Sequence, residues 1–504
     1  MVNDQPSRTD DQSVSRRRFV KAVGATGAVA GLAGCTGGDG GETTTESTTT
    51  GSGSDTTTGG DGTSGKTTVK WASDPRLKEN ADAIKQALHD AGLSKDIEVE
   101  IIAGAWETGK RQQQYQLWLS EKRAEPDILM MDNGWTIPFI ARGQLLNLSE
   151  ALPSDLVKTV ENDYFQASVQ TVKGKNGDLF GVPFFPDFPT MQYRKDLVED
   201  AGYGPEGQSW ATESMTWKKF AEVTKAVHGQ SDAKYGFTFQ AKAYEGLSCC
   251  DFNEFMSSWG GAYFGAHDNL FGPVGDRPVT VDEQPVIDAI KMVRTFIHGQ
   301  DDAHALDGWK GGFAPSTVLQ WTEETSRKPF TNGDAVMHRN WPYSININGK
   351  EENFGKDLGV MPIPYGVKEA DAKYKNTGGP VAALGGWHHT VNPNTARKEA
   401  SLEVLKAMMT EEFQLAVLET IGWLPPKPEL FNSSRAKEIP VMGRYMDTLK
   451  VAGENAIPRP VTVVWPTEST KIAQQVNAAL GQQKAPEKAM SDLKNQLTAI
   501  ENSA

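Results

Sequence analysis

PDILMMDNGWTIPFIARGQLLNL, residues 126–148, contains the clearest strand signal in the chain. Ile128 to Met131 form an unbroken apolar run, with Pro126-Asp127 before it and Asp132-Asn133-Gly134 after it. An apolar run this short, bounded by turn residues, predicts a strand that is buried on both faces. Such strands are typical of parallel sheets covered by helices. The segment therefore predicts an α/β fold.

Asp132 and Trp135 follow this strand at its carboxyl end, which is where ligands lie in open α/β sheets. A carboxylate accepts hydrogen bonds from hydroxyl groups, and an indole face covers the C–H face of a sugar ring. The alternative is that Asp132 caps the next short helix and Trp135 fills the core. From this segment alone, both interpretations stay open.

The residues before this strand alternate between strand and helix patterns. Val69–Ala72 and Ile97–Ile101 are predicted strands. Apolar positions from Ile84 to Ala91 predict one helix, and Arg111–Arg123 is a second. Strands that alternate with helices in this order pair in parallel through right-handed crossovers.

Three proline-rich segments interrupt this alternation: GVPFFPDFP (181–189), GWLPPKP (422–428) and PRPVTVVWP (458–466). The first contains Asp187 and the last contains Arg459. GVPFFPDFP is too rich in proline for a helix and is suited to a segment that crosses between domains. Apolar stripes elsewhere in the second half predict helices over Val286–Ile297 and Ala400–Met408.

The chain has 13 tryptophans, and several lie beside glycine or proline in predicted loops. Trp341 follows a short apolar strand in NGDAVMHRNWPY (332–343). Trp387 follows Gly385-Gly386 in GGPVAALGGWHHTV (378–391). Tryptophans of loops favour ligand contact over core packing, although core packing remains the alternative for each.

The N-terminus has the pattern of an export signal. Residues 15–21, SRRRFVK, match a twin-arginine motif, and Phe19–Ala33 is apolar but shorter than the ~20 residues of a membrane span. Leu32-Ala33-Gly34-Cys35 resembles a lipobox, in which Cys35 would carry the lipid. A frayed helix with a chance cysteine is the alternative. Residues 1–35 are thus predicted to direct export and lipid anchoring.

Residues 36–66 are predicted to form a disordered tether, because Thr36–Gly65 contains no apolar side chain. GDGTSGKT (60–67) satisfies the P-loop pattern, and its first six residues also fit GxGxxG. A working P-loop needs a strand before it and a helix after it. A strand-like run, Thr68–Ala72, follows instead, so we reject nucleotide binding here.

The composition excludes several other functions. A net charge of −14 argues against nucleic acid binding. Cys249 and Cys250 are expected to be reduced, because neighbouring Cα atoms lie closer together than disulfides usually span. The eight histidines show no metal-ligand spacing, and His388 and His389 would point to opposite faces of a strand. We therefore expect neither a metal nor a cofactor.

Five segments, in order, resemble the solute-binding proteins of ABC sugar importers, the family of maltose-binding and trehalose/maltose-binding proteins. They are the opening segment, GVPFFPDFPTMQYRKDLVEDAGY (181–203), GDAVMHRNWPY (333–343), LGGWHHTV (384–391) and RPVTVVWPTESTKIAQQVNAAL (459–480). The resemblance extends from about Thr67 to the C-terminus. NWPY and GGWH are most similar to the trehalose/maltose group. The N-terminal signal and tether resemble those of archaeal, especially haloarchaeal, members.

This resemblance implies a two-lobed fold of the type II periplasmic-binding-protein class, with a ligand cleft between lobes joined by crossing segments. The N-terminal lobe would comprise residues 67–183 and 382–424, and the C-terminal lobe residues 188–380 and 428–504. It also implies a set of sugar-binding residues: Arg111, Asp132, Asp187, Trp341, Trp387, Arg459 and, more weakly, Trp135. Phe185 stands where related proteins often have tyrosine, so one hydroxyl contact is missing.

The resemblance implies a monomeric binding protein, not an enzyme, with a sugar as ligand and an ABC permease as membrane partner. A secreted glycoside hydrolase that uses two carboxylates is the alternative, but no nucleophile elbow, zinc motif or triad order is present. A third interpretation is a binding protein for another solute, such as a polyol phosphate or a peptide. A phosphate would need a basic cleft or a bare helix N-terminus.

Overall fold

The computed structural model describes residues 66–503, which lie within one compact unit formed by residues 63–504. The export signal, Cys35 and nearly all of the tether predicted over residues 36–66 lie outside the described residues. Of the rejected P-loop pattern, Lys66 and Thr67 are described. A strand begins at Thr67, where a P-loop would require a helix.

The first sheet has the strand order β10-β9-β3-β1-β2, with β4 paired to β9. Its strands are β1 (Thr67–Ser73), β2 (Ile97–Ala103), β3 (Ile128–Asp132), β4 (Val182–Asp187), β9 (Ala382–Val391) and β10 (Ala456–Pro458). β1 pairs in parallel with both β2 and β3, as predicted. β3 is buried along its whole length. Its other neighbour, β9, is antiparallel, so the sheet is mixed and not purely parallel.

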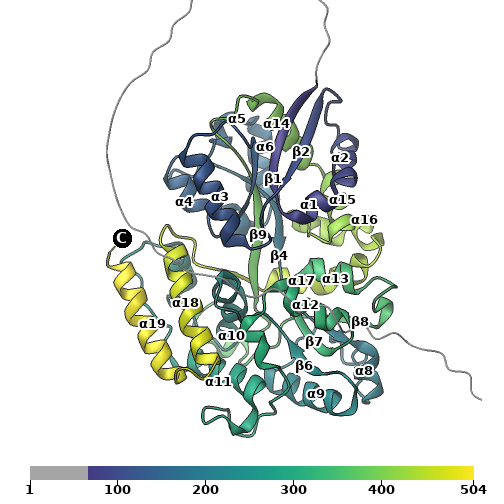
Figure 1. Ribbon diagram of the computed structural model, residues 1–504, viewed down its shortest axis with the longest axis vertical. Coiled ribbons are helices and arrows are strands. Elements are labelled where there is room, and N and C mark those ends of the chain that lie inside the picture. The colour runs from purple at the N-terminus through teal and green to yellow at the C-terminus, as the bar shows by residue number, and fades with distance from the viewer. Residues whose placement is uncertain (1–65, 504) are drawn as a thin grey trace, which may run out of the picture. The chain divides into compact units, whose positions relative to one another are not determined.

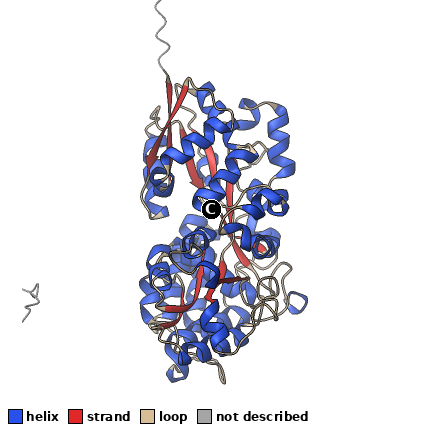
Figure 2. Cartoon of the chain, turned by 90° about the vertical axis from the view of Figure 1, so that its right-hand side faces the viewer, coloured by secondary structure: helices blue, strands red, loops and turns tan. Residues whose placement is uncertain are grey.

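The second sheet has the strand order β6-β7-β5-β8. Its strands are β5 (Thr190–Arg194), β6 (Tyr235–Thr238), β7 (Ala335–Asn340) and β8 (Leu358–Met361). β6 and β7 are parallel, whereas β5 is antiparallel to both of its neighbours. Helices surround the strands of both sheets, as Figure 2 shows. The α/β fold with two groups of strands agrees with the expected two-lobed architecture.

Helices of the first half are α1 (Pro75–Glu79), α2 (Ala81–Asp90), α3 (Thr108–Ser120), α4 (Thr136–Ala141), α5 (Leu148–Ala151), α6 (Ser154–Asp163), α7 (Gln166–Gln170), α8 (Lys195–Asp200), α9 (Trp217–Gln230) and α10 (Phe252–Ser258). Figure 1 shows α3 and α4 on one side of β1, and α1 and α2 on the other. A π-helical turn, Leu247–Asp251, precedes α10 directly.

Helices of the second half are α11 (Gln284–His298), α12 (Glu323–Thr331), α13 (Pro342–Asn348), α14 (Lys398–Met408), α15 (Glu411–Ile421), α16 (Ser434–Glu438), α17 (Met446–Glu454), α18 (Trp465–Leu480) and α19 (Pro486–Glu501). The stripes predicted for α11 and α14 are confirmed, because their apolar residues are buried apart from the partly exposed Ala400. Within residues 66–503, no helix combines the length and the apolar character that crossing a membrane requires.

β4 and β9 are the segments that link the two sheets. They pair side by side and antiparallel, and β5 of the second sheet begins three residues after β4 ends (Figure 1). β9 is long enough to take three partners: its first three residues pair with β10, and later ones pair with β4 and β3. β10 thus joins the first sheet, although residues 428–504 were assigned to the C-terminal lobe. The exact lobe boundaries remain a prediction.

Candidate ligand-binding cavity

A cavity of about 1160 Å³ opens where several strands end. It is lined by Asp74, directly after β1, by Asp132 and Asp187, the last residues of β3 and β4, and by Trp341, directly after β7. The carboxyl ends of strands are the edge at which α/β sheets bind ligands. The cavity therefore lies where the opening segment predicted a site.

Asp132 and Arg459 form the first charged cluster of the cavity. Arg459 Nη1 donates to Asp132 Oδ1 at 3.0 Å and to Glu245 Oε1 at 3.1 Å. Asp132 Oδ1 also accepts the backbone N–H of Gly134 at 2.8 Å. A Cβ at Gly134 would lie 2.7 Å from Arg459 Nη1, so a larger residue there would push the guanidinium aside. The cluster joins residues that are 327 positions apart in the chain.

The bond to Gly134 does not make Asp132 a helix cap. α4 begins at Thr136, its N-cap is Trp135, and no side chain caps it. The capping alternative for Asp132 is therefore wrong. Burial raises the pKa of the neighbouring Glu245 to about 7, and the nearby Asp132 carboxylate adds to this effect.

Arg111 and Trp387 form the second cluster. The Arg111 guanidinium lies 4.1 Å from the centre of the Trp387 ring, and its Nη2 pairs with Asp74 Oδ2 at 3.1 Å. A guanidinium over an indole is a cation–π contact, which fixes the ring orientation. Trp387 is partly exposed, whereas Arg111 is buried. Arg111 Nε and Nη1 are buried and have no hydrogen-bond partner within the described chain.

Trp341 and Asp187 meet at Gly385. A Cβ there would lie 2.8 Å from the Trp341 ring and 3.3 Å from the Cβ of Asp187, so the bare backbone makes room for both side chains. Burial raises the pKa of Asp187 well above its ordinary value, although Arg76 and Arg339 partly oppose this. Asp187 Oδ1 has no hydrogen-bond partner among residues 66–503. Asp187 is thus a buried carboxyl of the cavity wall with one unsatisfied oxygen.

Trp135 does not line the cavity. Its side chain is fully buried in a core cluster with Tyr115 and Phe139, and its ring meets that of Trp387 edge-on at 5.7 Å. The prediction that Trp135 contacts the ligand is therefore wrong, because its indole is packed in the core. Trp135 supports Trp387 from behind. The other six predicted site residues all line the cavity.

Several lining residues were missed from the sequence. Arg76 lies 4.0 Å from the centre of the Tyr343 ring and 4.9 Å from that of Trp106, which is 51% exposed. Asp74 follows a buried strand just as Asp132 does, so the same signal could have identified it. Tyr343 lies in the NWPY motif. The sequence around Glu245 does not mark it as a cavity residue, because only the fold brings it close to Arg459.

Phe185 and Trp423 form an aromatic wall. Their rings stack with centroids 4.3 Å apart and an interplanar angle of 12°, and both residues line the cavity. Phe185 offers a ring face but no hydroxyl group. This wall comes from β4 and from the GWLPPKP segment, which the sequence marked only as stiff.

Cys249 and Cys250 also line the cavity, and their sulfur atoms form a disulfide. The prediction of two reduced thiols was wrong. It used the Cα separation that is usual for cysteines far apart in sequence, whereas neighbours can close a small ring through their shared peptide bond. Their Cα atoms are 3.8 Å apart.

The described residues contain no group of three or more His, Cys, Asp or Glu side chains that could hold a metal ion. His388 and His389 are buried and make separate contacts: His388 Nε2 lies 2.6 Å from Thr171 Oγ1, and His389 stacks on Phe184. Burial lowers the pKa of each imidazole to about 3. Both histidines are structural.

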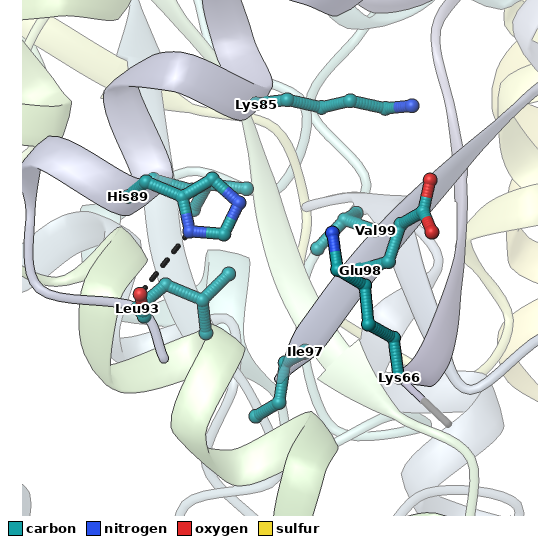
Figure 3. Close-up of a pocket in the computed structure, with 8 residues that line it drawn as sticks. Lys66, Lys85, His89, Leu93, Ile97, Glu98 and Val99 are labelled. Atoms are coloured by element: carbon teal, nitrogen blue, oxygen red, sulfur yellow. Dashed lines mark hydrogen bonds between the residues drawn. The ribbon is translucent and has the colours of Figure 1, made fainter. Parts of the chain in front are cut away.

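A second, smaller hollow of about 110 Å³ lies between α2 and β2 (Figure 3). His89 contacts the Leu93 carbonyl there at 3.1 Å, and Lys85 and Glu98 border it. None of the residues lining it is aromatic apart from His89, and its volume is about a tenth of that of the main cavity. The main cavity is therefore the candidate site.

Two groups of strands with a polar and aromatic cavity at their ends define a protein that holds a small solute. The chain belongs to the bacterial extracellular solute-binding protein family, which it matches over residues 82–442. A probable ABC transporter-binding protein of Deinococcus radiodurans is 28% identical over 410 residues, which are 80% of this chain and 86% of that protein.

Two solved structures extend the likeness to the whole described fold. Maltose-bound T. maritima MalE3 has a TM-score of 0.70 at 26% identity, covering 86% of this chain and 99% of that chain. An ABC transporter solute-binding protein from Thermotoga lettingae, bound with α-D-tagatose, has a TM-score of 0.65 at 18% identity, covering 86% and 99%. At 18% identity, the second likeness shows the fold alone.

Proposed function

We propose that the protein is the sugar-binding component of an ABC transporter. It captures an oligosaccharide, an α-linked glucose disaccharide such as trehalose or maltose, and delivers it to the membrane permease. The observation that carries this proposal is the combination, in one cavity, of ring faces with buried charged groups. Trp341, Trp387 and Trp423 supply ring faces, and Asp187 and Arg111 supply unpartnered polar atoms.

The size of the cavity favours an oligosaccharide over a single sugar. Its volume of about 1160 Å³ exceeds the roughly 300–1,000 Å³ of usual small-molecule sites. The likeness to maltose-bound MalE3 supports the same ligand class. The missing tyrosine hydroxyl at Phe185 removes one contact, so a sugar panel has to include several linkages.

The charge of the cavity favours a neutral ligand. Its three arginines are each paired: Arg76 with Asp74 and Glu324, Arg111 with Asp74, and Arg459 with Asp132 and Glu245. Pairing leaves little net positive charge for a phosphate. A polyol phosphate, the second candidate, is thereby disfavoured.

A glycoside hydrolase is the other candidate. Glu245, with a pKa raised to about 7, and Asp132 meet at one arginine nitrogen and could be taken for an acid and its partner. Against this, Arg459 holds both carboxylates through one nitrogen, and the matched family consists of solute-binding proteins. We therefore infer binding without turnover.

We further propose that the protein is exported through its twin-arginine signal and acts as a monomer on the outer face of the cytoplasmic membrane, anchored by a lipid on Cys35. The signal and lipobox patterns support this placement, as does membership of an extracellular family. An anchored binding protein stays close to its permease, which raises the effective concentration of the loaded form there.

A thermal-shift screen against a panel of α- and β-linked disaccharides, polyols and sugar phosphates tests the proposal. A ligand that binds only the folded state raises its apparent stability. An α-glucoside is expected to raise the melting temperature in a saturable way. A shift with sugar phosphates and none with sugars would favour the second candidate.

A further inference from the structure

The Cys249–Cys250 disulfide lies in the wall of the sugar cavity, at a place the proposed function leaves unexplained. The chain has three cysteines, and the third is Cys35. The two sulfur-bearing residues are only 3% and 2% exposed, yet both border the cavity. Both residues are therefore part of the cavity wall, although they are almost completely buried.

The disulfide lies within the π-helical turn Leu247–Asp251, directly after Glu245 and Gly246, which also line the cavity. On its other side, α18 contributes Ser469, Thr470 and Ala473 to the same lining. The disulfide is thus an apolar patch between a carboxylate and a helix with small side chains.

The turn is held in place by bonds that do not involve sulfur. Ser248 Oγ lies 2.6 Å from Ser469 Oγ, and the Tyr263 hydroxyl donates to the Ser248 carbonyl. Asp251 Oδ1 accepts the Gln240 N–H at 3.2 Å, and Asp251 Oδ2 lies 3.2 Å from Arg339 Nη1. Because both ends are fixed in this way, the turn does not depend on the S–S bond for its position.

We propose that the Cys249–Cys250 disulfide is part of the ligand-binding surface and presents an apolar face to a C–H face of the bound sugar. Glu245 then accepts hydroxyl hydrogen bonds at the edge of this face. Arg459 engages its Oε1, and a carboxylate has room for further donors. The inference rests on the proposed sugar-binding function and deepens it by adding a contact surface.

The bonded form suits this role better than two thiols. A disulfide has no hydrogen to donate and is polarizable, so it packs against C–H groups as an apolar surface does. Reduction breaks the S–S bond, adds a hydrogen to each sulfur and pushes the two sulfurs apart. The wall then changes shape and gains two weak donors. Affinity for the sugar is therefore expected to depend on the redox state.

The test uses the full chain with Cys35→Ser, in which Cys249 and Cys250 are the only sulfhydryl-forming residues. A dithiol reductant supplies two electrons and two protons, becomes a cyclic disulfide itself and leaves two thiols, which mass spectrometry after alkylation counts. Calorimetric titration with the disaccharide that gave the largest thermal shift is run before and after reduction. We expect about a tenfold loss of affinity on reduction, with the ligand-free melting temperature little changed.

Protection of the disulfide from reduction by bound sugar, and a variant without the two cysteines, provide further tests. Saturating sugar should slow reduction of the disulfide, because the ligand covers it. The double variant Cys249→Ala/Cys250→Ala should bind more weakly than the oxidised parent and ignore the reductant. If that double variant fails to fold, the comparison of the oxidised and reduced Cys35→Ser protein still tests the inference.

Equal affinity in both redox states overturns the inference and leaves sugar binding intact. A large fall in melting temperature with no protection by sugar also overturns it, because the disulfide would then be a structural link only. If no sugar binds even the oxidised parent, the proposed function itself fails. These outcomes separate the two claims.

Discussion

Trp135 and Trp387 show how neighbouring tryptophans take different roles. Their rings meet edge-on, but Trp135 is fully buried whereas Trp387 is partly exposed to the cavity and lies beneath the Arg111 guanidinium. Trp135 packs behind the ring of Trp387, which lines the cavity. We propose that the first side chain stabilises the fold and that the second binds the ligand.

Trp387→Ala is therefore expected to weaken sugar binding by at least tenfold, because it removes a stacking face. Some stability is lost with its contacts to Trp135 and Arg111, but the ligand-free protein should stay folded. Trp135→Ala is the matched control, for which a buried tryptophan predicts a loss of about 3–5 kcal/mol in unfolding free energy. Calorimetric titration and urea unfolding of both variants measure the two effects. A Trp387 variant with unchanged affinity would contradict the stacking role.

Asp132→Ala is expected to lose about 1.5–3 kcal/mol of binding free energy, or roughly ten- to a hundredfold in affinity, as for a hydrogen bond to a charged group. Asp127, the residue directly before the same strand, is the control. It is buried but bonds to the Lys70 N–H and lies outside the cavity lining. Asp127→Asn should lower the melting temperature and leave affinity intact. The reverse pattern in the two variants would show that Asp132 is structural.

At the scale of elements, the sequence predicted several strands and helices from local patterns. The βαβαβ start is confirmed from β1 to β3, as are α11 and α14, because period and composition are properties of neighbouring residues. The antiparallel insertion of β9 beside β3 was not predictable in this way. It depends on a partner more than 250 positions away, and nothing within the segment itself encodes that pairing.

The residues of the candidate site likewise fall into those predicted from the sequence and those that only the fold brings to the cavity. The family resemblance implied a set of residues that all line the cavity: Asp132, Asp187, Trp341, Trp387, Arg111 and Arg459. Glu245 and the disulfide were not predicted, because their roles arise only when the turn before α10 meets residues of the first sheet. Trp135 was misplaced because a loop pattern cannot say to which side a ring turns.

α18 and α19 are joined through a buried charge cluster. Arg277 Nη2 lies 3.2 Å from Glu468 Oε1 and 2.7 Å from Glu501 Oε1. Burial, together with the hydrogen bond to Glu501, raises the pKa of Glu468 to about 8. An unfolded glutamate titrates near about 4.3, so between these values the folded state binds more protons than the unfolded state.

The free energy of unfolding should therefore fall as pH rises from about 5 to 8. The Glu468 carboxyl contributes up to about 1.4 kcal/mol per pH unit to this fall. Glu468→Gln keeps a neutral side chain and should remove that part of the slope. Glu487→Gln, on the exposed first turn of α19, should leave the slope unchanged. The hydrogen bond to Lys291 lowers the pKa of Glu487, so this group is ionised in both the folded and the unfolded state over this pH range. Urea unfolding at several pH values measures the slopes. If the unfolding free energy of the wild type and of Glu468→Gln changed with pH by the same amount, the raised pKa of Glu468 would be contradicted.

At the scale of the whole molecule, the folded part of the chain belongs to a solute-binding family, and the N-terminal residues carry the proposed export signal and lipid anchor. The family match covers residues 82–442 and includes most cavity residues, but not the lipobox. Location and ligand binding are therefore separate claims that separate experiments can test.

Cys35→Ser is expected to move the exported protein from the membrane fraction to the soluble fraction, because no lipid can then be attached. Cys249→Ala/Cys250→Ala, which keeps Cys35, should stay with the membrane. Fractionation after a high-salt wash, followed by immunoblotting, measures the distribution. A Cys35→Ser protein that remains in the washed membrane would rule out the lipid on Cys35 as its anchor.

Calorimetric titration of the purified protein with maltose and trehalose, with recovery of the sugar afterwards, tests the central claim most directly. We predict saturable binding of one sugar molecule per chain for at least one of these α-glucosides. The disaccharide should be recovered intact, because the chain belongs to a family of solute-binding proteins and Arg459 holds both Asp132 and Glu245. Absence of heat with both sugars, or release of free glucose, would contradict it.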